Sequence, residues 1–193
     1  DKLAEDIEIE EAISEELRNE GAEALRNGDV DAAMGVGRRI VDEIIQNPRV
    51  TLDLIDLRSY DDYTYRHSVN VAVISTVIGI NMQLNRLALD ELSIAAILHD
   101  IGKRRIDPKI INKKGKLTPE EYTEVKRHSE YGYEMVKSRI DLSAKIKNAI
   151  LLHHENEDGS GYPKGLKGNQ IFIYAKIIHV ADVFDALTAK RPY

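Results

Sequence analysis

Apolar residues recur at steps of three and four along most of this chain, and this periodicity limits the fold more than any other feature. Val69, Val73, Val77 and Ile80 share one helical face in a segment that begins near Thr64. Glycine and proline are sparse and fall between such segments, and no clear hairpin sequence with alternating β-branched residues occurs. We therefore expect an all-α fold.

The same pattern predicts helices in five further segments, which are residues 7–26, 30–45, 86–98, 143–155 and 173–189. Another helix begins at Thr118, where a threonine cap, a proline in the first turn and a glutamate three residues after the cap form a helix-start signature. We expect this helix to continue through Val136 and to carry His128. A short segment over residues 52–59 leads into the main body of the chain.

The length of 193 residues suits one well-packed domain with a small addition. We place a helical extension at residues 1–60 and the main domain at residues 61–193. Because the first residue is Asp1 rather than methionine, we expect a fragment of a longer product, with an upstream sensor domain as one option.

Composition limits the cellular location and the classes of ligand that we expect for this chain. Hydrophobic residues make up 42% and charged residues 31% of the chain, as in ordinary soluble proteins. No apolar run approaches the roughly 18 residues that span a bilayer, and no signal-peptide pattern occurs, so we expect a cytoplasmic protein without a membrane segment. The net charge of -6 argues against large nucleic acids as ligands, although a local basic cluster could receive a small phosphate-bearing molecule.

Histidines are the candidates for metal binding, because the chain contains no cysteine and any metal must be held by imidazole and carboxylate. Five of the six histidines lie on or at the end of an apolar-faced helix: His67, His99, His128, His153 and His154. A single buried histidine is usually structural. Five together, two of them adjacent, favour a shared metal that would satisfy all of them. We expect the sixth, His179, to be structural or exposed.

Two aspartates join this group. Asp100 follows His99 near a helix end, where consecutive side chains can both reach a cluster at the helix terminus. Alone, this pair would be explained equally well as a hydrogen-bonded helix cap. Asp182 lies on the expected inner face of the last helix, where its carboxylate would otherwise be an unpaired buried charge. Together with the histidines, the two aspartates favour metal binding.

These residues stand in motifs with a known counterpart. The run from His99 to Lys103 resembles the signature of the HD-domain phosphohydrolases. A larger set is similar to the HD-GYP subfamily, in the same order and at compatible spacing: His153-His154-Glu155, residues 158–163, Val180-Ala181-Asp182, residues 184–188 and Arg191-Pro192-Tyr193. The resemblance covers about Asp61 to Tyr193. It implies an HD-domain helical bundle, truncated here at its C-terminal end, and a phosphodiesterase that converts cyclic di-GMP to linear pGpG or GMP.

The resemblance also implies two divalent metal ions, typically iron or manganese, bridged by Asp100. The first ion would be held by His67, His99, Asp100 and Asp182. The second would be held by Asp100, His128, His153 and His154. Some members bind a third ion through a glutamate one turn before the first histidine. Tyr63 occupies that position here, so we expect two ions, although Asp61 and Asp62 lie nearby.

Two ions about 3.5–4 Å apart can share a hydroxide and clamp the phosphate oxygens, so Asp100 would be catalytic as their bridging ligand. The resemblance gives Lys103 the role of stabilising the charge that develops on the phosphoryl group. Without it, Lys103 would be explained as a solvated lysine at a helix C-terminus.

The remaining candidates would contact the substrate. Arg191 is expected to bind the second phosphate or a guanine edge through two hydrogen bonds. Gly161, Tyr162 and Pro163 belong to a turn-rich loop that either lines the substrate groove or packs as a rigid turn on the metal helices.

Two other functions remain open. The chain could be a non-catalytic module that binds a cyclic dinucleotide or docks a partner protein, but a complete ligand set argues against this. It could also be an HD hydrolase with another nucleotide substrate, which the GYP-like loop disfavours. The N-terminal helices are expected to form a homodimer interface, to receive a signal from an upstream domain, or simply to present a solvated acidic face.

Overall fold

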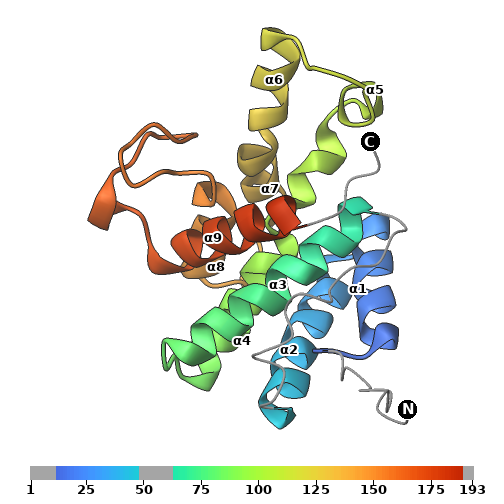
Figure 1. Cartoon of the computed structure of the whole chain (residues 1–193), viewed down its shortest axis with the longest axis vertical. Coiled ribbons are helices and arrows are strands. Elements are labelled where there is room, and N and C mark those ends of the chain that lie inside the picture. Colours follow the sequence, from blue (N-terminus) through green and yellow to red (C-terminus); the bar gives the residue numbers. More distant parts are fainter. Residues whose placement is uncertain (1–11, 48–62, 189–193) are drawn as a thin grey trace, which may run out of the picture.

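The computed structural model describes residues 12–47 and 63–188, and within these ranges all regular structure is helical (Figure 1). The predicted all-α fold is therefore confirmed. The longer helices are α1 (Glu15–Asn27), α2 (Val30–Gln46), α3 (Tyr63–Asn81), α4 (Arg86–Leu98) and α9 (Ile173–Thr188). The shorter ones are η3 (Ile101–Arg105), α5 (Pro108–Ile111), α6 (Pro119–Lys126), α7 (His128–Val136), α8 (Ala144–Leu152) and η4 (Gly168–Gln170). No helix in the described ranges is long and apolar enough to cross a membrane.

Polar caps fix where these helices begin. The side chains of Ser14, Asp29, Asn85 and Ser143 each accept a hydrogen bond from a backbone N–H in the first turn of α1, α2, α4 and α8. Thr118 and Glu121 form the reciprocal capping box that the sequence predicts for α6. These bonds satisfy N–H groups that have no partner inside the helix.

The single helix predicted from Thr118 to Val136 is wrong, because the structure divides it into α6 and α7. Arg127 separates them with a turn-like ψ of -7°. The imidazole of His128 donates from Nδ1 to the carbonyl oxygen of Val125 at 2.7 Å. In a continuous helix that carbonyl would accept from the N–H of Ser129. Similarly, α8 ends at Leu152 rather than at the predicted Glu155.

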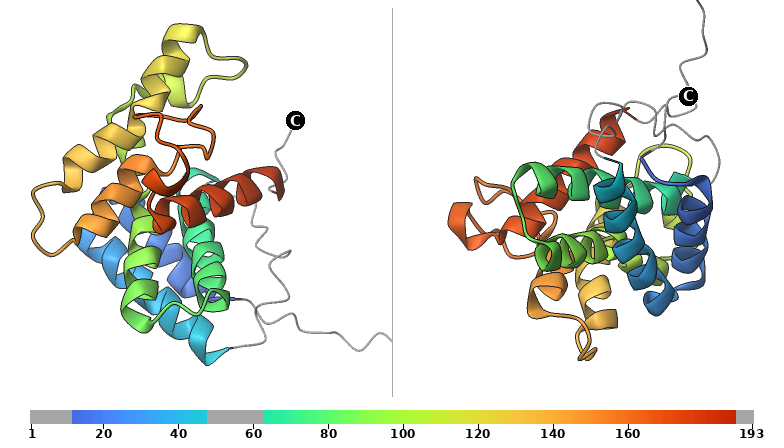
Figure 2. Two further views of the ribbon diagram at one scale, coloured as in Figure 1. Left: turned by 90° about the vertical axis from the view of Figure 1, so that its left-hand side faces the viewer. Right: turned by 90° about the horizontal axis from the view of Figure 1, so that it is seen from below.

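One hydrophobic core joins the N-terminal helices to the rest of the described chain. Fully buried side chains come from α1, α2, α4, α8 and α9, and include Leu17, Ile40, Ile97, Ile150 and Ile178. Helices α1 and α2 pack against α3 and α4 (Figure 2). The predicted domain boundary at residue 60 and the predicted segment 52–59 lie outside the described residues, so the division into an extension and a main domain stays a prediction.

Close backbone packing brings η3 against α7. A Cβ atom on Gly102 would lie 1.9 Å from the carbonyl oxygen of His128 and 2.4 Å from the backbone nitrogen of Gly132. Only glycine fits such an approach. This contact places the end of α4, with His99 and Asp100, beside the start of α7.

Candidate metal centre

The predicted ligands lie mainly where helices end. His99 and Asp100 follow α4, His128 is the first residue of α7, and His153 and His154 follow α8. His67 and Asp182 project from α3 and α9. Most of these side chains are buried, so the group is enclosed by protein rather than spread over a surface.

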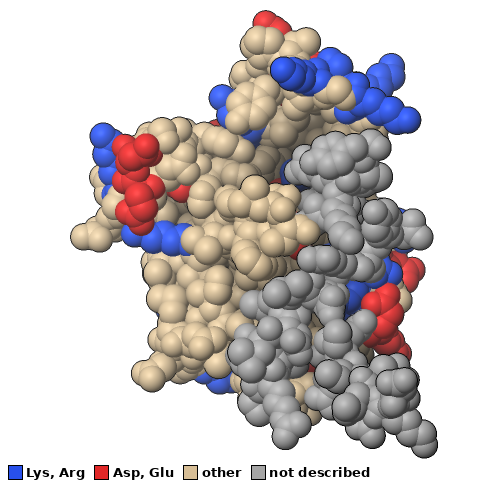
Figure 3. Space-filling view, in the orientation of Figure 1, with Lys and Arg blue, Asp and Glu red and all other residues tan. Residues whose placement is uncertain are grey.

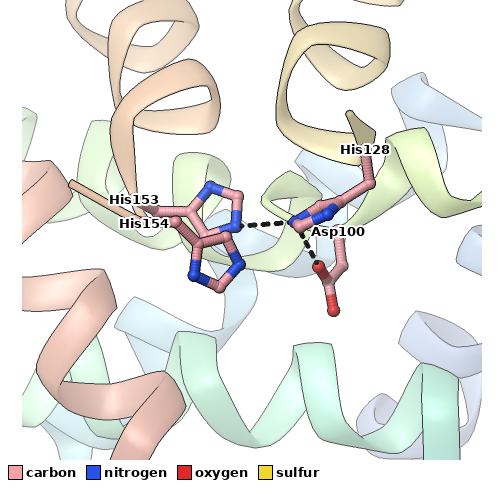
Figure 4. A group of neighbouring side chains, drawn as sticks. All are labelled: Asp100, His128, His153 and His154. Carbon is pink, nitrogen blue, oxygen red and sulfur yellow. Dashed lines mark hydrogen bonds and ion pairs between the residues drawn. The ribbon is translucent and has the colours of Figure 1, made fainter. Parts of the chain in front are cut away.

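Four of the ligands form what we call the imidazole half: His128, His153 and His154 with the shared Asp100. Their ligand atoms all lie within 4.8 Å of one another. His128 Nε2 is 3.3 Å from Asp100 Oδ1 and 3.2 Å from His153 Nε2. Figure 4 shows the three imidazoles and the carboxylate turned toward a common point.

The other ligands form the carboxylate half: His67, His99 and Asp182 with the shared Asp100. Ligand atoms of His67, His99 and Asp100 lie within 4.8 Å of one another. His67 Nε2 is 3.0 Å from Asp182 Oδ1, and His99 Nε2 is 3.4 Å from Asp100 Oδ2. Asp100 therefore presents Oδ1 to the imidazole half and Oδ2 to the carboxylate half, as a bridging ligand would.

Each of four imidazoles is oriented by a bond from its Nδ1 atom. His99, His128 and His153 donate to the carbonyl oxygens of Ala96, Val125 and Ile150, at 2.6–2.8 Å. His67 instead donates to the Asp185 carboxylate at 2.6 Å. With Nδ1 engaged, each ring presents its Nε2 atom to the cluster, which is the usual arrangement around protein-bound metals.

The polar atoms of this cluster fit a metal. His99 Nε2 and Asp100 Oδ1 are buried and have no hydrogen-bond partner among the described residues. Such atoms are costly to bury unless something else satisfies them. Nitrogen and carboxylate oxygen without sulfur suit iron or manganese. The donor set therefore fits divalent metal ions.

The two halves differ in their affinity for protons. Burial lowers the pKa of His67, but hydrogen bonds to Asp182 and Asp185 outweigh it and raise that pKa to about 9. Burial opposes ionisation of Asp182, but the bond to His67 lowers its pKa to about 2. In the imidazole half, burial lowers the pKa of His154 to about 3 and also lowers the pKa values of His128 and His153. These three rings are neutral at pH 7 and ready to bind a cation.

A cavity of about 350 Å³ opens beside the Asp100 carboxylate, and basic side chains are among those that line it. Asp100 and Lys103 line it together with Tyr65, Ser68 and Arg104. The Lys103 ammonium forms an ion pair with Asp100 Oδ2. The lining continues into α5, and lysines and arginines gather at that end of the molecule (Figure 3).

The GYP-like loop lies against the imidazole half. The Tyr162 ring stacks on the His154 ring with centroids 4.7 Å apart, and the backbone N–H of Tyr162 donates to the His154 carbonyl oxygen at 3.1 Å. A Cβ on Gly161 would lie 2.4 Å from that same oxygen, so the approach requires glycine. Pro163 follows Tyr162 and is half-buried. The loop thus packs on a metal-ligand candidate, and a part in substrate binding stays a prediction.

Some predicted residues cannot be placed. Arg191 lies outside the described residues, as do Asp61 and Asp62, and the side chain of Tyr63 is not described. His179, expected to be structural or exposed, is half-buried and donates from Nδ1 to the His153 carbonyl oxygen at 2.8 Å.

Sequence reasoning missed the residues that support the ligands. Asp185 orients His67, and the buried Glu155 accepts from the N–H groups of Lys164 and Leu166 at 2.6 and 2.8 Å, which fastens the loop. Both stand inside the quoted motifs. The spacing of Asp185, three residues after Asp182 on one helix, would have placed the two carboxylates on the same face.

Known proteins are similar to this chain in sequence and in fold. The HD-domain family matches residues 49–193. A cyclic di-GMP phosphodiesterase of Pseudomonas aeruginosa is 40% identical over 158 residues, which are 80% of this chain and 38% of that protein. A cyclic di-GMP phosphodiesterase of Thermotoga maritima is 40% identical over 148 residues, 74% of this chain and 39% of that protein.

A third relative has a different stated substrate. It is 3'3'-cGAMP-specific phosphodiesterase 1 of Vibrio cholerae, 36% identical over 79% of this chain and 35% of that protein. The chain thus spans under two fifths of the length of these relatives. In overall fold it is similar to an HDG"Y"P protein from Bdellovibrio bacteriovorus, with a TM-score of 0.75 at 21% identity over 92% of this chain and 60% of that one. The match over residues 49–193 shows that the chain belongs to the HD-domain family.

Proposed function

We propose that this chain is the catalytic part of a metal-dependent phosphodiesterase that hydrolyses cyclic di-GMP. The observation that carries the proposal is the buried convergence of imidazoles on the two oxygens of Asp100, where two buried polar atoms have no hydrogen-bond partner within residues 12–47 and 63–188. Relatives named as cyclic di-GMP phosphodiesterases, about 40% identical over most of this chain, support the choice of substrate.

Two divalent ions, iron or manganese, would fill the two halves. His67, His99 and Asp182 would hold one ion, His128, His153 and His154 the other, and Asp100 would bridge them. When bound, such a pair acts as a Lewis acid at a phosphate and lowers the pKa of a coordinated water to about 7. Because the ligands carry only two formal negative charges, the loaded site would keep a positive charge that attracts a phosphodiester.

The protein's own groups would position the phosphate. Lys103 lies in the cavity beside Asp100, where its ammonium would face the phosphoryl oxygens and stabilise the charge that develops on them. Gly161, Tyr162 and Pro163 would form the side of the groove next to His154. Arg191 would contact the second phosphate or a guanine edge. Addition of water across one P–O bond gives linear pGpG, and a second addition gives GMP.

Other parts of the proposal concern the whole protein. We place the catalytic domain at residues 61–193, and expect a cytoplasmic location because the substrate is an internal second messenger. The N-terminal helices would form a homodimer contact or receive a signal from an upstream sensor domain.

Turnover measured with defined metals tests the function. The metal-free chain, reloaded anaerobically with Fe²⁺ or Mn²⁺, should hydrolyse cyclic di-GMP, and Asp100→Asn should lose about 10³-fold, because metal-ion catalysis contributes several kcal/mol. Asp42→Asn, an exposed change in an ion pair with Arg86 on the N-terminal side of the fold, is the matched control. No metal-dependent turnover, in a chain that binds cyclic di-GMP, would favour the non-catalytic binding module instead.

The substrate has one specific rival. Because a Vibrio cholerae relative is named as specific for 3'3'-cGAMP, the two cyclic dinucleotides should be compared under identical conditions, with linear pGpG as a third substrate. Faster turnover of 3'3'-cGAMP would reassign the substrate without changing the site.

A further inference from the structure

A line of buried polar contacts connects helix α1 to the carboxylate half. His67 Nδ1 donates to Asp185 Oδ2 at 2.6 Å, and Asp185 Oδ1 accepts from Asn70 Nδ2 at 3.1 Å. Asn70 Oδ1 in turn accepts from Arg18 Nη1 at 2.7 Å. The line therefore runs from α1 through α3 to α9 and back to His67 on α3. Figure 1 shows α3 lying between α1 and α9.

The residues of this line are buried, so the loss of any one contact would leave a buried polar group without its hydrogen bond. Arg18 is 4% exposed, Asp185 5% and Asn70 9%. A guanidinium stays protonated under all ordinary conditions, so its burial is costly unless strong acceptors satisfy it. Glu15, at 3.4 Å from Nε, supplies one acceptor at the exposed end, and Asn70 supplies another inside the protein.

The donor and acceptor roles in these three hydrogen bonds follow from Arg18. Arginine has only donors, so the Asn70 amide must turn its oxygen to Arg18 and its NH₂ group to Asp185. Asp185 is then held on one oxygen by that NH₂ group and accepts the Nδ1 proton of His67 on the other. The proton on Nδ1 leaves Nε2 of His67 directed at Asp182 and Asp100, as metal ligation requires.

We propose that Arg18 is a positioning residue for the carboxylate half and that it acts through Asn70 and Asp185 to fix the ring of His67. Helix α1 is then part of the metal site in function, although it contributes no ligand. A shift of α1 against α3 would allow the Asn70 amide to rotate. The affinity for one of the two metal ions would then fall. This inference rests on the proposed function, because it requires His67 to be a ligand.

Metal binding by variants tests the proposal without an activity assay. Arg18→Met and Asn70→Leu keep approximate volume and break the line at two different points, whereas Arg18→Lys keeps a charged donor. Manganese binding would be followed by equilibrium dialysis with elemental analysis, beside thermal unfolding. Leu17→Ala is the matched control, since Leu17 is a neighbouring, fully buried apolar residue of α1.

We expect Arg18→Met and Asn70→Leu to lower the affinity for one of the two manganese ions about tenfold. This is the lower end of the effect known for groups that orient metal ligands. The other ion should bind as in the unchanged chain. The Arg18→Lys variant should keep most of the affinity that Arg18→Met loses. Leu17→Ala should lower the Tm while both ions keep their affinity.

Two results would overturn the inference. One is unchanged affinity for both ions in Arg18→Met and Asn70→Leu. The other is a loss in Leu17→Ala as large as in Arg18→Met at a similar Tm, because the effect would then come from general loosening of α1. His67→Ala separates this failure from that of the proposed function: if it leaves both ions bound, the assignment of His67 as a ligand is wrong.

Discussion

The two halves of the candidate metal centre share Asp100 but are built differently. In the imidazole half, His128 and His153 are oriented by carbonyl oxygens of their own helical turns, three residues earlier in the chain. In the carboxylate half, His67 is oriented by Asp185, which belongs to another helix 118 residues away in sequence. Both of these rings in the imidazole half are therefore set by local backbone. The carboxylate half combines one ring set in the same way, His99 by the Ala96 carbonyl oxygen, with His67, which is set by a contact that exists only in the folded protein.

The difference also appears in charge. The imidazole half has three rings whose pKa values are lowered, chiefly by burial, and it needs no proton removed before a cation binds at pH 7. The carboxylate half surrounds His67 with Asp100, Asp182 and Asp185, which raise its pKa to about 9. A metal entering that half must displace a proton. An imidazole ligand is thus already neutral in the imidazole half, whereas in the carboxylate half the imidazole of His67 must first lose a proton.

The largest expected effect comes from removing one ligand of each half. His153→Ala should lose the ion of the imidazole half and keep the other, and His67→Ala should do the reverse, because each half has its own enclosing ligands around Asp100. Elemental analysis should find about one equivalent of manganese in each variant where the unchanged chain binds two. If either change removed both ions, the halves would form one inseparable site.

Packing at Gly102 should disturb the imidazole half first. Gly102→Ala places a methyl group against the backbone of His128 and Gly132, which moves α7 away from Asp100. We expect the free energy of unfolding to fall by about 3 kcal/mol, as for overpacked sites, and the ion next to His128 to bind more weakly. The measurements are urea unfolding and manganese dialysis.

The control for that change is another glycine. Gly35 lies inside α2 and an added Cβ meets nothing within 4 Å, so Gly35→Ala should stabilise the protein by roughly 0.5–1 kcal/mol. Equal losses at Gly102 and Gly35 would contradict the role given to the contact between η3 and α7.

The contrast between local and distant contacts also explains what the sequence could predict. Caps such as Thr118 with Glu121 depend on neighbours in the chain, so helix starts were readable. The break after Lys126 was not, because the apolar periodicity continues through it. The contact found at the break, between the His128 side chain and the Val125 carbonyl oxygen, has no counterpart in that pattern. Periodicity reports which face is buried and says nothing about a turn that a metal-ligand candidate requires.

The candidate site divides in the same way. The adjacent pair His99-Asp100 alone fits a helix cap equally well, and the other histidines with Asp182 were needed to favour metal binding. The resemblance supplied the division into two ligand sets, which stays a prediction. Arg18 carries no local signal, because its partner Asn70 lies 52 residues away and both appear as ordinary polar residues in helical segments. Only the packing of α1 on α3 shows that they meet.

A pH titration should separate the halves further. His67, with its pKa raised to about 9, holds a proton at pH 7, and raising the pH toward 9 removes this competitor. Manganese affinity of the carboxylate half should therefore rise about tenfold per pH unit from 7 upward, while the imidazole half changes little. Binding isotherms of the His153→Ala and His67→Ala variants at pH 7 and 8 measure the two slopes separately. Equal slopes would mean that proton competition does not distinguish the halves.

The smallest effect concerns the loop that contacts the imidazole half through Tyr162 and His154. Glu155→Gln replaces a carboxylate that accepts from the N–H groups of Lys164 and Leu166 by an amide that can accept only through one oxygen. Losing a buried hydrogen bond to a charged group should cost about 2 kcal/mol of unfolding free energy. Tyr162 should then stack less firmly on His154.

The exposed Glu157→Gln, beside Lys176, is the control and should change the free energy of unfolding by less than about 0.5 kcal/mol. Chemical unfolding of both variants decides the matter: equal losses would show that Glu155 does not hold the loop, and the orientation of Tyr162 would need another cause.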